Sequence, residues 1–176
     1  MAARTVGVLT EDTYAREFVR GLVSRLRAEG VLSGPSASLV VQRYAGVCNA
    51  KSGRQVRVLL EVRGCDLVIT PVDAHGRRVS EVEGDVRSHV DARLRSRVRV
   101  VVCRRCIEEW LAAGYGLPSS DPLEEVRSFF LKKRGSPYEK RELPRLAGDE
   151  NLRVDRMLSC ESFRQFVEAL REALRA

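Results

Sequence analysis

The chain has 176 residues, of which 44% are hydrophobic and 31% are charged. This apolar content is enough to bury a core, which excludes an intrinsically disordered chain and a small protein held together by disulfides. The net charge of +7 permits contact with nucleic acid, although solvated arginines alone would also account for it. No apolar run approaches the roughly 18 residues of a membrane helix, so we expect a cytoplasmic protein with no signal peptide and no membrane partner.

Short apolar runs alternate with helical periods along the first part of the chain. The runs expected to form strands are residues 6–9, 39–44, 67–72 and 98–102. Between them, apolar residues recur at helical spacing within residues 14–26, 51–63 and 79–94. Strands that alternate with helices in this way are typical of βαβ units. The sequence therefore predicts a three-layer α/β/α fold with a mainly parallel sheet of about four strands in the order 2-1-3-4.

The composition changes after Gly116. Prolines at positions 118, 122, 137 and 144 punctuate short helical pieces, and residues 163–174 carry apolar side chains on one face of a final helix. We expect residues 1–116 to form the α/β core and residues 117–176 to form a helical extension that packs on it, within one compact domain.

Side chains that can bind metal ions follow two of the predicted strands. Glu11 comes after the first strand, and Asp73 and His75 come after the third. Ligands of open parallel sheets bind beyond the carboxyl ends of the strands. Two carboxylates held close together repel each other, and a divalent cation removes this penalty. Oxygen ligands favour Mg²⁺ or Mn²⁺, and an imidazole shifts the preference towards Mn²⁺. The alternative is that Glu11 and Asp73 cap helices and that His75 is an ordinary turn residue.

Several segments resemble Toprim-like domains, which occur in topoisomerases, primases and OLD-type nucleases. Residues 6–19 are similar to the opening of these domains, whose first strand ends in a glutamate, here Glu11. Residues 66–76 end in Asp-Ala-His-Gly and resemble the third-strand segment, which ends in Asp-x-Asp-Gly. Residues 107–111, Ile-Glu-Glu-Trp-Leu, resemble the Glu-x-Trp-Leu motif of an uncharacterised prokaryotic subgroup that is often encoded near defence genes. Residues 162–166 are similar to the closing helix of that subgroup.

The resemblance implies Mg²⁺-dependent chemistry on the phosphodiester bonds of DNA or RNA. It implies that Asp73 and His75 hold a metal ion, and that Glu11 holds the ion or transfers a proton at the reacting oxygen. It also implies that Glu108 adds a further carboxylate from the start of the fourth helix. The expected function is a nuclease-like hydrolase in prokaryotic defence or DNA metabolism.

Three positions depart from the family pattern. Asp12 stands where the family usually has a glycine, His75 replaces the second aspartate of the pair, and Gly114 stands where the subgroup often has an aspartate. These departures leave open a second function, a catalytically silent Toprim-like module that binds nucleic acid or a partner protein. The sequence also leaves open whether the chain forms a homodimer.

Basic residues surround an aromatic residue in the later part of the chain. Lys140 and Arg141 follow Pro137 and Tyr138, a pattern that can grip a nucleic-acid backbone and stack a base. Cations that decorate a helix C-terminus would give the same pattern.

A lone C-x-x-C motif, Cys103 to Cys106, follows the fourth predicted strand. A structural zinc site needs four ligands, and no second pair exists in the sequence. Arg104 and Arg105 between the cysteines could lower a thiol pKa, so a redox switch is one interpretation. Simple buried cysteines are the other.

Overall fold

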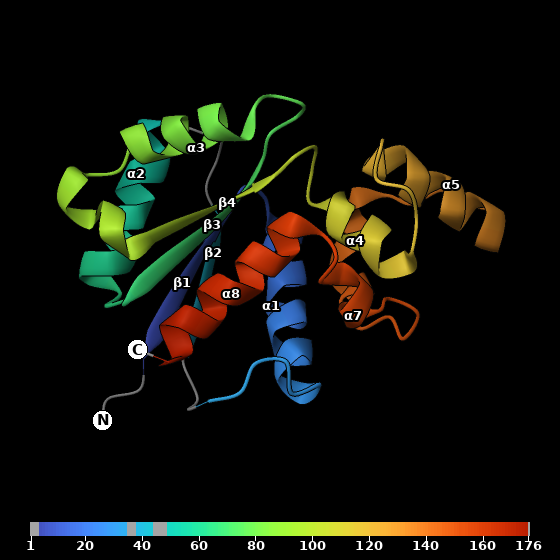
Figure 1. The fold of residues 1–176 in the computed structure, drawn as a ribbon, viewed down its shortest axis with the longest axis horizontal. Helices are drawn as coiled ribbons and strands as arrows, with labels where there is room; N and C mark the ends of the chain where they lie inside the picture. The colour runs from blue at the N-terminus through green and yellow to red at the C-terminus, as the bar shows by residue number, and fades with distance from the viewer. Residues whose placement is uncertain (1–3, 35–37, 44–48, 176) are drawn as a thin grey trace.

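A computed structural model describes residues 4–34, 38–43 and 49–175. Within these residues, four parallel strands form one sheet in the order β2-β1-β3-β4 (Figure 1). The strands are β1 (Thr5–Thr10), β2 (Ser38–Arg43), β3 (Leu67–Asp73) and β4 (Val98–Cys103). Both the predicted α/β class and the predicted strand order are confirmed. The expected end of the second strand at Tyr44 lies outside the described residues.

Helices and short helical turns, joined by loops, connect the strands within the described chain. The α-helices are α1 (Thr13–Ala28), α2 (Ala50–Arg57), α3 (Val79–Ser88), α4 (Glu108–Tyr115), α5 (Pro122–Arg134), α6 (Leu143–Leu146), α7 (Val154–Met157) and α8 (Glu161–Arg175). A π-helical turn, η1 (Val58–Val62), continues α2, and the 3₁₀ turns are η2 (Ala92–Arg97) and η3 (Lys140–Glu142). None of the described helices combines the length and the apolar character needed to cross a membrane.

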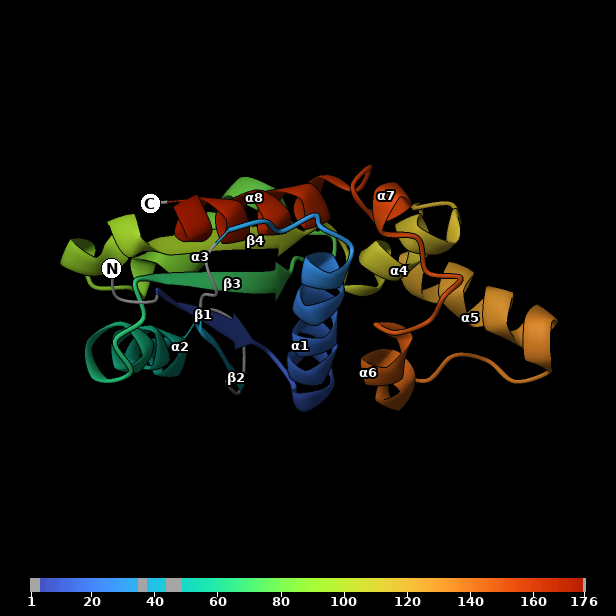
Figure 2. The same ribbon diagram turned by 90° about the horizontal axis from the view of Figure 1, so that it is seen from below.

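Helices cover both faces of the sheet, which gives the three layers. On one face, Val8 of β1 and Ile69 of β3 belong to a core cluster shared with α1, α4 and α8. On the other face, Leu9 and Val68 pack with α2 and η1, and Val72 packs with α3. Figure 2 shows α8 lying along β4, with α1 nearby at the carboxyl ends of the strands. Because both faces of the sheet are covered, the strands have almost continuous hydrophobic sequences.

Two of the expected helices are shorter than the sequence predicts. The regular part of the helix expected at 51–63 ends at Arg57, and the chain continues as the π turn η1. The helix expected at 79–94 ends at Ser88, and Asp91 caps the 3₁₀ turn η2 by accepting a hydrogen bond from Arg93 N at 3.2 Å. Local side chain to backbone hydrogen bonds of this kind compete with helix propagation.

Glycine 53 allows α2 to pack against the end of α3. A Cβ atom at this position would lie 2.0 Å from the carbonyl oxygen of His89, which is far inside van der Waals contact. Any side chain at position 53 would therefore push the two segments apart.

The part of the chain after Gly116 packs partly on the sheet itself. Helix α8 lies against β3 and β4, and its Phe163 and Phe166 rings contact Trp110 of α4, with centroids 5.3 and 5.2 Å apart. The expected division of the chain after Gly116 stays a prediction, but α8 supplies part of one layer of the α/β/α fold.

Candidate metal centre

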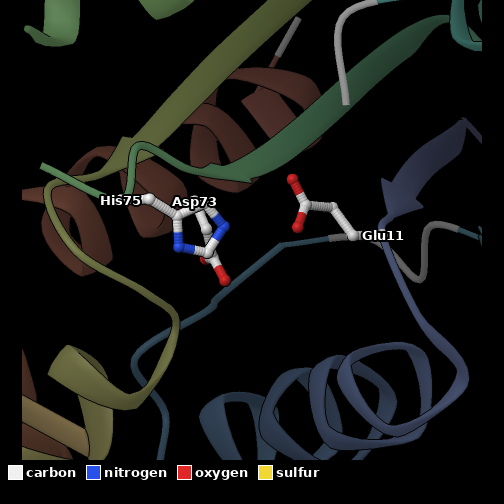
Figure 3. A group of neighbouring side chains, drawn as sticks. All are labelled: Glu11, Asp73 and His75. Atoms are coloured by element: carbon white, nitrogen blue, oxygen red, sulfur yellow. The ribbon is translucent and has the colours of Figure 1, made fainter. Parts of the chain in front are cut away.

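Three side chains meet at the carboxyl ends of the two central strands. Glu11 directly follows β1, Asp73 is the last residue of β3, and His75 lies two residues further on. Ligand atoms of these three residues all lie within 4.8 Å of one another (Figure 3). The group brings together two carboxylates and one imidazole, which could hold a divalent metal ion.

The loop that carries His75 is held against the next loop of the sheet by backbone hydrogen bonds. Ala74 N donates to Cys103 O at 2.8 Å, His75 N donates to Arg105 O at 3.0 Å, and Gly76 N donates to Arg104 O at 3.2 Å. His75 has a φ of +50°, a left-handed conformation that is uncommon for a residue with a side chain. These three hydrogen bonds offset the cost of that conformation and hold the backbone that carries His75.

Burial strongly disfavours the charged forms of the two carboxylates. Burial raises the pKa of Glu11 from 4.5 to about 7. Burial, and then the charge of Glu11, raise the pKa of Asp73 from 3.8 to about 8. Within the described part of the chain, Oε1 of Glu11 is buried and accepts no hydrogen bond. A buried oxygen without a partner is costly, and a cation bound between the carboxylates would satisfy it. The donor set and this oxygen both fit Mg²⁺ or Mn²⁺.

Glu108 lies near this group but outside it. Its side chain is 2% exposed, and its Oε1 accepts a hydrogen bond from Tyr138 Oη at 3.0 Å and pairs with Lys140 Nζ at 2.9 Å. Burial acts to raise the pKa of Glu108, but the charge and hydrogen bond of Lys140, together with hydrogen bonds from Cys106 and the backbone, outweigh it, and the pKa falls below its usual value. The further carboxylate implied by the family resemblance is therefore present as one half of a buried ion pair.

The two basic residues expected to contact nucleic acid lie in different surroundings. Lys140 turns inwards, and its Nζ lies between Glu108 and Asp12, 4.0 Å from Oδ2 of Asp12. Arg141 remains on the surface, where its side chain is 72% exposed and pairs with Glu139 at 2.7 Å. Arg141 is accordingly the more exposed of the two.

Asp12 is the N-cap of α1. Its Oδ1 accepts a hydrogen bond from Ala15 N at 2.7 Å, while its Oδ2 faces Lys140. The departure from glycine at this position therefore has a local function in starting α1.

Packing explains the glycine at position 114. A Cβ atom on Gly114 would lie 2.4 Å from Cδ1 of Leu152 and 2.9 Å from Cγ of Met157. An aspartate, which the resembling subgroup often has here, does not fit between these side chains. The departure at this position is thus a consequence of how α4 meets α7 and the segment before it.

Sequence reasoning missed two contributions to the site. It did not place Lys140 in the acidic pocket, because residue 140 lies in a proline-punctuated stretch without periodicity. It also assigned Arg105 only to the cysteine motif, although this exposed residue reaches the loop of His75. A Cβ atom on Gly76 would lie 3.8 Å from Nη1 of Arg105. The position of Arg105 could have been predicted from the strand order. Because β3 and β4 are neighbours, the loop after β4, which contains Arg105, must lie beside the loop after β3.

The thiols of the C-x-x-C motif are in surroundings that do not activate them. Cys103 is fully buried, and burial raises its pKa well above the usual value. Burial, followed by the charge of Glu108, also raises the pKa of Cys106. The expected lowering of a thiol pKa by the adjacent arginines is wrong; Arg104 instead pairs with Glu161 at 2.8 Å. This environment favours the interpretation of simple buried cysteines.

Comparisons with protein-family models, with curated proteins and with solved structures found no match. The fold and the geometry of Glu11, Asp73 and His75 are therefore the basis for assigning a function.

Proposed function

We propose that this chain is a nuclease-like hydrolase of the Toprim type, which acts on phosphodiester bonds and uses Mg²⁺ or Mn²⁺. The observation that carries the proposal is the convergence of Glu11, Asp73 and His75, with ligand atoms within 4.8 Å of one another at the carboxyl ends of adjacent strands. A divalent ion held there would polarise a phosphoryl oxygen and favour attack by water.

Each residue of the group has a distinct task in this proposal. Asp73 supplies a carboxylate from the end of β3, and His75 supplies a ring nitrogen from the hydrogen-bonded loop beside it. Glu11 either completes the ligand set or accepts a proton from the attacking water. A pKa near 7 suits the second task, because the carboxylate can then accept and release a proton near neutral pH. As a metal ligand, Glu11 would have to be deprotonated.

Basic groups near the centre support a nucleic-acid substrate, DNA or RNA. The guanidinium of Arg105 is exposed beside the loop of His75, and the chain carries a net charge of +7. Arginine binds phosphate groups through a planar set of donors, which suits the backbone next to a bond that is cut. We place this activity in the cytoplasm of a prokaryotic cell, in defence or DNA metabolism, on the strength of the Toprim-like resemblance.

The second candidate is a catalytically silent module that binds nucleic acid or a partner protein. The observation that favours it is His75, which is exposed and carries one negative charge fewer than the aspartate of the Toprim pattern. A weaker set of charged ligands lowers the affinity for Mg²⁺ more than that for Mn²⁺.

The test uses end-labelled single- and double-stranded DNA and RNA, incubated with Mg²⁺, Mn²⁺ or EDTA. We expect metal-dependent cleavage by the wild type and at least a hundredfold loss in Asp73→Asn, with an unchanged circular dichroism spectrum. Asp155→Asn, which changes an exposed carboxylate paired with Arg153, is the control and should cut normally. Salt-sensitive binding without cleavage by the wild type would favour the silent module. Undiminished cleavage by Asp73→Asn would exclude this centre.

A further inference from the structure

A lysine from the later part of the chain reaches into the acidic pocket. Lys140 begins η3, and it lines the same small pocket as Glu11, Asp12 and Asp73. Its ammonium lies 2.9 Å from Glu108 and 4.0 Å from Asp12. Four carboxylates thus surround this region. The ammonium pairs with the two that do not belong to the three-residue group, and its charge also acts on Asp73 and Glu11.

The position of the ammonium is fixed by contacts on the buried side. Glu108 is held by the hydroxyl of Tyr138 and is almost completely inaccessible, whereas the Lys140 side chain is 34% exposed. The ammonium therefore donates one hydrogen bond to Glu108, and its other N–H groups can bind groups on the open side of the pocket.

The charge of Lys140 disfavours the binding of a second metal ion beside the first. Enzymes that use two ions hold them about 3.5–4 Å apart, bridged and flanked by carboxylates. In this protein the carboxylates of Asp12 and Glu108 lie beside the three-residue group, but both already face the ammonium of Lys140. A second divalent ion there would have to displace a bound positive charge from a buried carboxylate.

We propose that Lys140 is the permanent second cation of this centre, so that the centre binds one divalent ion and presents an ammonium where two-metal enzymes place another. This inference rests on the proposed function. It names Lys140 as the residue that would hold a phosphate oxygen next to the metal ion, with Glu108 and Tyr138 as the residues that position it.

The number of bound Mn²⁺ ions tests this proposal without any measurement of cleavage. Equilibrium dialysis, with free Mn²⁺ followed by electron paramagnetic resonance, would be applied to the wild type and to Lys140→Met, Lys140→Arg and Lys132→Met. We expect one ion per chain for the wild type, for the arginine variant, and for the control at the exposed Lys132 of α5. We expect two ions for Lys140→Met, because the carboxylates of Asp12 and Glu108 become free to bind metal.

Each other outcome has a defined meaning. Two ions in the wild type, or one ion of unchanged affinity in Lys140→Met, would overturn the role of Lys140 while leaving the metal centre intact. No ion in the wild type would overturn the proposed function, and this inference with it. If Lys140→Met does not fold, Lys140→Gln removes the charge and keeps a donor for Glu108. If neither variant folds, Lys140 serves the fold alone and the proposal is wrong.

Discussion

Replacing Glu11 by glutamine removes a carboxylate whose charged form is destabilised by burial when no metal ion is bound. The pKa of Glu11 rises from 4.5 to about 7 on folding, because the carboxylate is buried. The folded protein therefore binds more protons at this site than the unfolded chain does between these two pH values. It follows that the free energy of unfolding decreases as the pH rises from about 4.5 to about 7.

The size of the effect follows from the shift in pKa. Above pH 7, a carboxylate whose pKa has moved from 4.5 to about 7 lowers the free energy of unfolding by about 3 kcal/mol. Because Glu11 keeps some contact with water, we expect about 2–3 kcal/mol, or roughly 4–12 °C in Tm for a chain of this length. The raised pKa of Asp73 likewise lowers the free energy of unfolding as the pH rises to about 8. The variant also loses the charge of Glu11, which removes part of the rise in the pKa of Asp73.

The assay is urea unfolding of the wild type and Glu11→Gln in EDTA, followed by circular dichroism at about pH 5 and about pH 8.5. We expect the variant to gain about 2–3 kcal/mol relative to the wild type between the two pH values. Glu150→Gln, at an exposed loop position, controls for the loss of one negative charge. Added Mn²⁺ should stabilise the wild type at the higher pH and the variant much less. An identical difference between the two proteins at both pH values would refute the argument.

Two further predictions concern packing and buried polar groups, and urea unfolding measures both. Gly53→Ala should lower the free energy of unfolding by about 1–3 kcal/mol, because its Cβ would overlap the carbonyl oxygen of His89. Gly84→Ala, in α3 with nothing near its Cβ, should instead raise it by about 0.5–1 kcal/mol, and a loss at both sites would contradict the packing argument. Ser162→Ala should cost about 1–3 kcal/mol, because the hydroxyl bonds the buried carboxylate of Glu109; no loss would show that Glu109 finds another donor.

The meeting of Glu11 with Asp73 and His75 could be predicted from the sequence because it depends on few assumptions. Alternating strands and helices predict a parallel sheet, and the order 2-1-3-4 makes the first and third strands neighbours. Side chains at the carboxyl ends of neighbouring strands then lie close together whatever the details of the loops. The geometry follows from topology, whereas the roles of the three residues stay predictions.

The position of Lys140 could not be predicted in the same way. Its approach to Glu108 depends on the path of residues 117–139, where prolines break the helical period and no repeating pattern fixes a direction. The hydrogen bond between Ser162 and the buried carboxylate of Glu109 could not be predicted either, because the two residues are 53 positions apart in the chain. Long-range polar pairs leave no periodic signal in a single sequence.

Helix α8 has a consequence for the order in which the chain can acquire its structure. It lies over β3 and β4, although β4 ends at Cys103 and α8 begins only at Glu161. During synthesis, the apolar side of these strands is completed long before its cover emerges from the ribosome. A nascent chain of this protein therefore exposes that apolar surface until nearly sixty further residues have been added, and association between unfinished chains competes with folding during this time.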